Sequence, residues 1–257
     1  MERLKTNQKS GITASGLRKF GLLFVILGIV SRSILQNQFL GMSNAGQNLM
    51  DTMMNMPDAM QIATLALILQ ALETCAVPVF CFLLVEGVVH TSNFKQYGIR
   101  VLGLAVISEI PYNLAYSAKL LDFSSRNPVF GLVLSMVVIY FYQQYSGMIF
   151  KNVLIKILVT VMAIIWANML KIDHAACCVL IVAALWALRE KPVYRNIMGC
   201  TAAVVCTMFS MYYLAAPMAF MIMHFYNGEK GQTNRVMDYL SYPVLLFVIG
   251  ISALFLF

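Results

Sequence analysis

The sequence predicts an all-α polytopic membrane protein, a bundle of about nine transmembrane helices. Of its 257 residues, 60% are hydrophobic and only 11% are charged, whereas soluble domains carry about 25% charged residues. Long apolar runs recur along the chain, bounded by charges, Pro or Gly. Because a bilayer core about 30 Å thick needs about 20 apolar residues per helix, this length has room for roughly nine spans joined by short loops.

The nine expected spans differ in how well they match the thickness of a bilayer. Residues 60–90 would form a helix of about 46 Å at 1.5 Å per residue, so we expect a kink, at Pro78. Residues 214–226 are short for a span and suggest a half-helix or a re-entrant element. In order, the expected spans are 20–37, 60–90, 98–116, 129–146, 150–169, 174–189, 197–213, 214–226 and 240–257.

The flanking segments complete this division into one membrane domain. Residues 1–19 are polar and basic without the pattern of a cleaved signal, so we expect a cytoplasmic tail followed by a single transmembrane domain over 20–257. The Met-rich segment 41–60 is weakly charged, and we expect it to lie along the outer interface.

The distribution of basic residues predicts the orientation. Those assigned to one side far outnumber the others, and the positive-inside rule places that side, with the N-terminus, in the cytoplasm. The opposite side carries Arg32, Lys119, Arg126 and Lys171 only. The net charge of +7 is therefore explained by topology and by contacts with lipid headgroups, and it does not indicate a nucleic-acid partner. The six cysteines lie in or beside apolar runs without disulfide or zinc spacing, so no metal site is predicted.

Acidic residues inside predicted spans are candidates for function, because an ionised carboxylate in hydrocarbon costs on the order of 2.5–3.5 kcal/mol. Glu109 precedes Pro111, which is expected to open its helix. A carboxylate there suits substrate binding or proton transfer; the alternative is a structural tie to an Arg or Asn. We also expect the neighbouring Tyr112 and Asn113 to face the substrate.

Two acid–histidine pairs have similar alternatives. Glu86 and His90 lie on one helical face, where they would relay protons or act as a solvated helix end. Asp173 and His174 begin a helix on the outer side, where Asp would cap the helix or the pair would perform acid–base chemistry.

A turn on the cytoplasmic side is a further candidate. Residues 226–231 read YNGEKG, and Asn-Gly favours a left-handed backbone. Its Tyr226, Asn227 and Gly228 would shape the mouth of a site for a phosphate-bearing cofactor, although the turn requires no function and lacks nucleotide-binding spacing.

Several of these segments together resemble the TraX family. The similar segments are residues 78–91 (PVFCFLLVEGVVHT), 108–115 (SEIPYNLA), 171–173 (KID), 226–231 (YNGEKG) and 241–243 (SYP). The resemblance implies an acetyltransferase of the bacterial inner membrane, related to transmembrane acyltransferases. It would use acetyl-CoA to modify a peptide or cell-envelope acceptor, as family members are associated with acetylation of the pilin N-terminus. It further implies that Glu109 and Asn113 orient a substrate and that Asp173 with His174 supplies acid–base function.

The sequence departs from the family pattern at three places. The first span reads Ser31-Arg32 where the family has Asp-His, and the second has Glu73 and no Gly-Arg before Pro78. Leu245 replaces a His after the Tyr-Pro. A lost first-span His removes the expected base, so the alternative is a non-catalytic binding or assembly protein that keeps the fold. Arg32 and Glu73 have opposite signs, and we expect them to pair.

Overall fold

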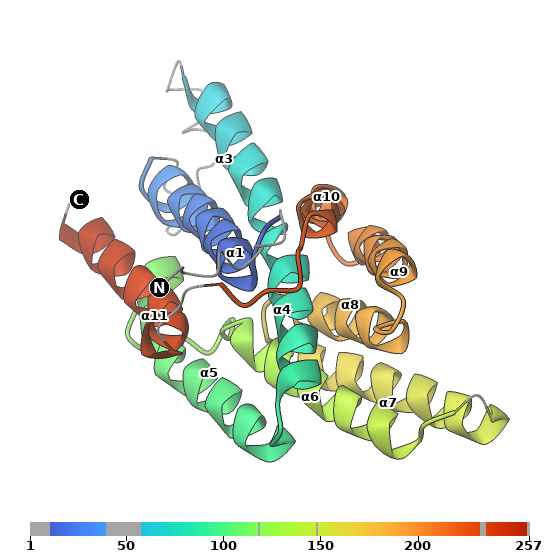
Figure 1. The fold of residues 1–257 in the computed structure, drawn as a ribbon. Helices are drawn as coiled ribbons and strands as arrows, with labels where there is room; N and C mark the ends of the chain where they lie inside the picture. Colours follow the sequence, from blue (N-terminus) through green and yellow to red (C-terminus); the bar gives the residue numbers. More distant parts are fainter. Residues whose placement is uncertain (1–10, 40–57, 118, 148, 232–234, 256–257) are drawn as a thin grey trace, which may run out of the picture.

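The computed structural model describes residues 11–39, 58–117, 119–147, 149–231 and 235–255. These residues form helices and no strands, which confirms the predicted all-α class (Figure 1). The α-helices are α1 (Ala14–Ile29), α3 (Ala59–Glu73), α4 (Ala76–His90), α5 (Phe94–Ser117), α6 (Val129–Gln144), α7 (Phe150–Met169), α8 (Ala175–Ala187), α9 (Pro192–Val205), α10 (Met218–His224) and α11 (Arg235–Phe255). The π-helix η1 (Val30–Phe39) continues α1, and two 3₁₀ turns, η3 (Cys206–Met208) and η4 (Met211–Leu214), follow α9.

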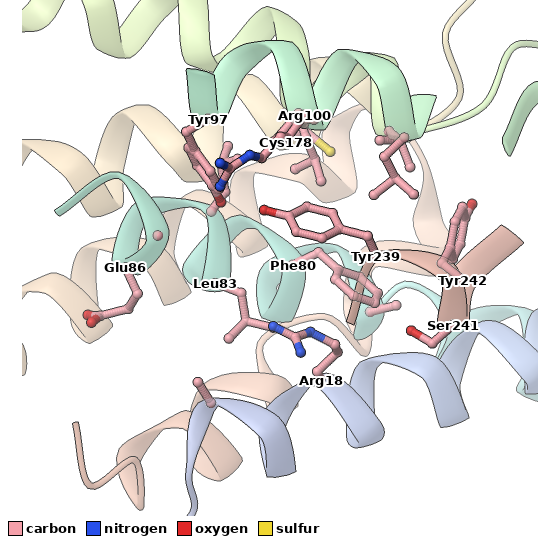
Figure 2. Close-up of a pocket in the computed structure, with 18 of the residues that line it drawn as sticks. Arg18, Phe80, Leu83, Glu86, Tyr97, Arg100, Cys178, Tyr239, Ser241 and Tyr242 are labelled. Atoms are coloured by element: carbon pink, nitrogen blue, oxygen red, sulfur yellow. The ribbon is translucent and has the colours of Figure 1, made fainter. Parts of the chain in front are cut away.

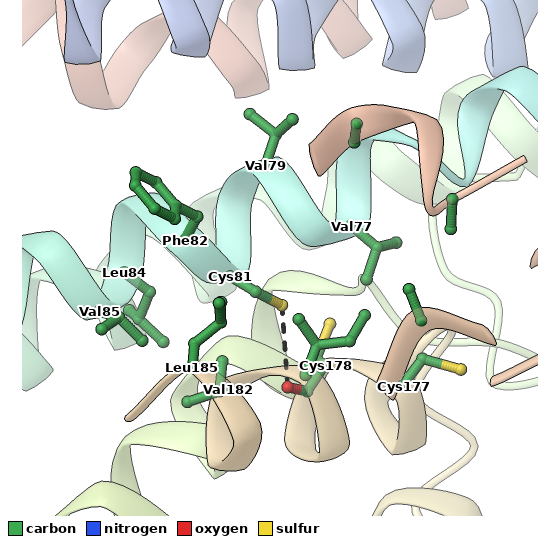
Figure 3. Packing of buried hydrophobic residues seen from close by; sticks show 14 of the residues in the cluster. Val77, Val79, Cys81, Phe82, Leu84, Val85, Cys177, Cys178, Val182 and Leu185 are labelled. Atoms are coloured by element: carbon green, nitrogen blue, oxygen red, sulfur yellow. Dashed lines mark hydrogen bonds between the residues drawn. The ribbon is translucent and has the colours of Figure 1, made fainter. Parts of the chain in front are cut away.

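Helices α4 and α8 form the centre of the molecule. Helix α4 crosses the middle of Figure 1, with α5 and α11 on its left and α8 and α9 on its right. Helix α8 contacts α4, α6, α7 and α9, and its side chains are almost all buried. Figure 3 shows the facing surfaces of α4 and α8, where Cys81 donates a hydrogen bond of 3.7 Å to the Cys178 carbonyl. At 13 residues, α8 is about 20 Å long and is enclosed by protein.

Three helical segments among the described residues are long and apolar enough to cross a membrane: Ala14–Gln36, Ala59–His90 and Phe150–Met169. Helix α7 has the bounds that the sequence predicted, and most of it lies outside the core. Exposed Leu154, Ile157 and Trp166 are the kind of surface that lipid covers. Shorter apolar helices lie at Val129–Gln144, Ala175–Ala187 and Tyr239–Ser252.

The long segment 60–90 breaks in the turn before Pro78. Helix α3 ends at Glu73 and α4 begins at Ala76, with turns at Thr74 and Cys75 between them. Pro78 lies in the first turn of α4. Backbone N–H groups in a first turn have no partner within the helix, so the N–H that proline lacks costs little there. Because a proline clashes with the carbonyl of residue i−4, which is Thr74 here, the break lies where a kink caused by Pro78 is expected, and the prediction is confirmed.

Other predicted boundaries require correction. Pro111 does not open α5, which continues to Ser117. The span predicted at 197–213 is replaced by α9 and the two 3₁₀ turns, whereas the half-helix suggested for 214–226 corresponds to the seven-residue α10. Helix α1 begins at Ala14, before the predicted end of the tail at residue 19. The predicted interfacial segment 41–60 lies mostly outside the described residues.

Candidate functional site

A cavity of about 640 Å³ extends between α1, α4, α5 and α11. Helices α1 and α4 run in opposite directions along the cavity, so the start of α1 lies beside the end of α4, and the end of α1 lies beside the start of α4. These two pairs of helix ends define the two ends of the cavity. One end, here called the mouth, is lined near the start of α1 and the end of α4, by Arg18 and His90. The other, the far end, is lined by Val25, Ala76 and His174. Leu22, Phe80, Leu83, Val101 and Leu104 supply apolar walls between the two ends.

The mouth carries basic side chains from three elements. Arg18 of α1 and Arg100 of α5 lie on opposite sides of the cavity, with Phe80 and Tyr239 between them (Figure 2). Lys230 of the loop after α10 joins them. Guanidinium and ammonium groups around a half-apolar channel are suited to a phosphate group attached to an organic chain.

An ion pair lies beside the mouth. Glu86 of α4 accepts a hydrogen bond of 2.6 Å from Arg195 of α9, and both side chains are largely buried. Arg195 also stacks over Phe82, 4.5 Å from the ring centroid. His90 is 3.7 Å from the Glu86 carboxylate but its side chain is 67% exposed. The predicted Glu86–His90 pair therefore exists, and the stronger partner of Glu86 is Arg195, which is distant in sequence.

The predicted turn has two roles. Tyr226, Gly228 and Lys230 line the cavity. Burial and the nearby Glu86 carboxylate raise the pKa of Tyr226 to about 12, so it is a neutral hydroxyl at physiological pH. Asn227 does not line the cavity, because its backbone N–H donates to the Ile12 carbonyl and its side chain accepts from the Glu229 N–H.

That turn also caps the first helix. The N–H groups of Ala14 and Ser15 donate to the carbonyls of Glu229 and Lys230. These are helix N-terminal donors that would otherwise have no partner. The Asn-Gly turn thus fixes the start of α1, and with it the position of Arg18, at the mouth.

A polar network occupies the region just beyond the far end. Arg32, in the π-helical turn after α1, donates a hydrogen bond of 3.0 Å to Asp173 Oδ2. Its Nε lies 3.8 Å from Glu73 Oε2. The Tyr112 hydroxyl donates a hydrogen bond of 2.9 Å to the Asp173 carboxylate, and the Tyr116 hydroxyl donates one of 2.7 Å to the Glu73 carboxylate. The predicted pairing of Arg32 with Glu73 is confirmed, and Asp173 is a second acidic partner that was not predicted.

The network keeps Asp173 ionised. Asp173 lies in the loop between α7 and α8 and is mostly buried. Burial alone opposes its charge, but His174, Arg32 and the Tyr112 hydroxyl together hold the pKa of its carboxyl below the usual value. It is not the N-cap of α8, because His174 occupies that position.

His174 is the titratable group best placed for chemistry. Its backbone is left-handed, with φ of 58°, a conformation that costs a non-glycine residue free energy and often marks functional sites. Nδ1 and the Tyr213 hydroxyl share a hydrogen bond of 2.7 Å. Nε2 is buried and has no hydrogen-bond partner among the described residues. Nδ1 is thus held in place, whereas Nε2 lies 3.8 Å from Asp173 Oδ1 and makes no hydrogen bond in the described part of the chain.

The remaining predicted residues lie elsewhere. Glu109 lines neither this cavity nor the smaller one described below. Its carboxylate accepts a hydrogen bond of 3.1 Å from the Asn127 backbone N–H. This is the structural tie that the sequence left as the alternative. Asn113 is buried and its Oδ1 has no partner among the described residues, but it also lines neither cavity.

Comparison with known proteins decides the family. The family description TraX (TraX protein) matches residues 40–252, well over half of the chain. The chain belongs to the TraX family. The match begins after α1 and η1, so it leaves out Arg18 of the mouth and Arg32, and it includes Glu73, Asp173 and His174. Searches of curated proteins and of solved structures returned no significant match.

The geometry also bears on the departures from the TraX pattern. Neither His90 nor His224 occupies the far end: His90 is exposed at the mouth, and His224 is exposed at the end of α10. His174 is the histidine that reaches it. Sequence reasoning missed Tyr213, Arg195 and the basic mouth residues Arg18 and Arg100, because their significance depends on which helices are neighbours.

Proposed function

We propose that this TraX-family chain is a multi-pass protein of the bacterial inner membrane that transfers acetyl groups from acetyl-CoA. The observation that carries the proposal is the large cavity, which joins a basic mouth to His174, whose Nε2 makes no hydrogen bond among the described residues. Arg18, Arg100 and Lys230 would hold the phosphates, and the apolar walls would hold the pantetheine arm. Acetyl-CoA would supply an activated thioester, and the acceptor would be a peptide or a cell-envelope component.

The grouping of basic residues supports an orientation with the N-terminus in the cytoplasm. Arg126 and Lys171, predicted on the outer side, are joined by a backbone hydrogen bond of 2.9 Å, and Arg32 reaches Asp173 in the same region. Arg18, Arg100 and Lys230 lie at the other end of the cavity. This arrangement follows the positive-inside rule and opens the mouth to cytoplasmic acetyl-CoA.

The far end offers acid–base chemistry without the family's first-span histidine. Tyr213 orients the imidazole of His174, and Nε2 is positioned to accept a proton from the acceptor. Arg32 and the two tyrosines hold the carboxylates of Asp173 and Glu73 in place. Asp173 lies 3.8 Å from His174 Nε2 and contributes to the electrostatic field around the imidazole.

Ligand binding by the detergent-purified chain tests this function. A ligand that binds only the folded state stabilises it, by about 2.7 kcal/mol at a hundredfold excess over Kd. We expect acetyl-CoA to raise the unfolding temperature more than ATP does, and the double variant Arg18→Ala/Arg100→Ala to lose most of the shift. Lys95→Ala is the matched control, since Lys95 is exposed at the same end but does not line the cavity.

The alternative function is a non-catalytic binding or assembly protein. The observation that favours it is Arg32, a fixed cation in place of a first-span base. No thermal shift with millimolar acetyl-CoA, in a preparation that unfolds cooperatively, would favour this alternative.

A further inference from the structure

A second cavity lies beyond the far end of the first. It has a volume of about 340 Å³ and is bordered by the ends of α3 and α7, the start of α8 and the 3₁₀ turns after α9. Helix α1 starts at the mouth of the large cavity and leads to Arg32, which lines the second one. His174 lines both cavities. A ligand in the second cavity would therefore approach the imidazole from the side opposite the mouth.

The second cavity offers neutral hydrogen-bonding groups that the fold does not use. The hydroxyls of Ser210 and Tyr212 have no hydrogen-bond partner within the described parts of the chain. Gln70 uses its amide oxygen to accept from Gln36, and its amide nitrogen has no partner there. The side-chain amide nitrogen of Asn168 donates a hydrogen bond to the Ile164 carbonyl. The side-chain oxygen of Asn168 is left as an acceptor for a ligand. Donors and acceptors of this kind suit a ligand that also carries both, such as a polyol.

The charges of the second cavity are already paired. Asp173 is the acidic residue among its described lining residues, and its Oδ2 accepts from both Arg32 and Tyr112. A protonated amine would need an unpaired carboxylate to offset its loss of hydration. The lining therefore disfavours an ammonium group and tolerates a neutral one. The aromatic side chains of Phe209 and Tyr212 also line the cavity and add apolar surface for a ring-shaped ligand.

From these observations we infer that the second cavity binds a neutral, hydroxyl-bearing acceptor of the sugar type, and that transfer produces an ester. The inference rests on the proposed acetyl transfer and names its acceptor class. As the acceptor oxygen forms a C–O bond to the acetyl carbonyl, the C–S bond of the thioester breaks. His174 Nε2 takes the hydroxyl proton and returns it to the CoA thiolate, so the products are the acetyl ester and CoA.

The test uses the full chain in detergent with two kinds of probe. The first is a panel of methyl glycosides of glucose, rhamnose and N-acetylglucosamine; the second is alanyl-alanine amide, which carries a free amine. Binding is followed by saturation-transfer NMR without acetyl-CoA, and transfer by mass spectrometry with it. The variants are Ser210→Ala/Tyr212→Phe and the blocking change Ser210→Trp. Tyr194→Phe is the matched control, because Tyr194 is exposed on α9 and lines neither cavity.

We expect at least one glycoside to bind and to gain an O-acetyl group. Both cavity variants should lower its transfer at least tenfold while the thermal shift with acetyl-CoA stays at the wild-type value, and Tyr194→Phe should change neither. Acetylation of the dipeptide with inert glycosides would overturn the inference. So would glycoside binding that both cavity variants leave unchanged.

The two proposals fail separately. A thermal shift with acetyl-CoA but no bound glycoside overturns the acceptor class and leaves acetyl transfer standing. Glycoside binding that depends on Ser210 and Tyr212, without any response to acetyl-CoA, supports the sugar site and overturns acetyl transfer.

Discussion

The two ends of the large cavity are both charged, but they use charge differently. At the mouth, Arg18, Arg100 and Lys230 come from separate elements and line the cavity, while Glu86 pairs closely with Arg195 and more distantly with His90. Just beyond the far end, Arg32 is shared by two carboxylates that also accept hydrogen bonds from Tyr112 and Tyr116. The mouth thus gathers cations from separate elements around a cavity, whereas the network beyond the far end joins one cation to two carboxylates beside His174.

The largest effect is expected at His174. His174→Ala should lower acetyl transfer by about 10²–10⁴-fold, the usual contribution of a general base, with acetyl-CoA binding retained. His224→Ala is the control, since His224 is exposed and lines neither cavity. Release of CoA from acetyl-CoA in the presence of acceptor is the measurement. Full activity of His174→Ala would remove the far end from the chemistry.

Removal of Arg32 should have the next largest effect. Arg32→Met leaves two mostly buried carboxylates without their cation, which costs about 3–5 kcal/mol of unfolding free energy. Adding Glu73→Gln and Asp173→Asn should recover part of this loss, because the uncompensated charges are then gone. Unfolding followed by intrinsic fluorescence gives the values. An Arg32→Met protein as stable as the wild type would show that the network has no structural role.

A smaller loss is expected at Gly28, where α1 meets the far end. A Cβ at this position would overlap the Glu73 side chain. Gly28→Ala should therefore displace Glu73 and cost about 1–3 kcal/mol, as overpacking usually does. Gly103→Ala is the control, since a Cβ there meets open space. Comparable unfolding temperatures for the two variants would contradict the close approach of α1 and α3.

At the mouth we expect a change in binding alone. Arg18→Ala or Arg100→Ala should each raise the KM for acetyl-CoA by about tenfold, or about 1.4 kcal/mol, and leave kcat near its wild-type value. This pattern would indicate that the mouth binds the ground state and the transition state equally. A fall in kcat without a change in KM would place these arginines in the chemistry and would erase the contrast between the two ends.

The smallest effect is expected on the outer surface. Ile157→Ala on α7 should change stability by no more than about 0.5 kcal/mol, because that side chain is 56% exposed. Ile181→Ala on α8 removes a fully buried side chain and should cost about 2–5 kcal/mol. Equal losses in reconstituted membranes would show that α7 packs against another protein surface.

The accuracy of the sequence-based predictions varied with the range of the interactions. The bounds of α7 were predicted because charges enclose a continuous apolar run. The break at Thr74–Cys75 was predicted because Pro78 disrupts the turn that precedes it. The pair of Glu86 with Arg195 joins residues 109 positions apart, and nothing local indicates it.

The candidate site shows the same division. Asp173 and His174 were identified because charged residues are rare beside apolar runs, and Glu109 was identified for the same reason but has a structural contact. Pattern alone could not separate these cases, since a buried carboxylate is costly whether it serves catalysis or holds a loop.

By itself, the sequence determined that this protein is helical, that it carries apolar segments of membrane-spanning length and that it belongs to the TraX family. These properties follow from composition, from runs of adjacent residues and from short motifs, all of which are local. The tertiary structure alone decided that His174 stands between two cavities with Tyr213 on one nitrogen, and that Arg32 joins Glu73 to Asp173. Such arrangements depend on which helices pack together, and packing joins residues that are far apart in the chain.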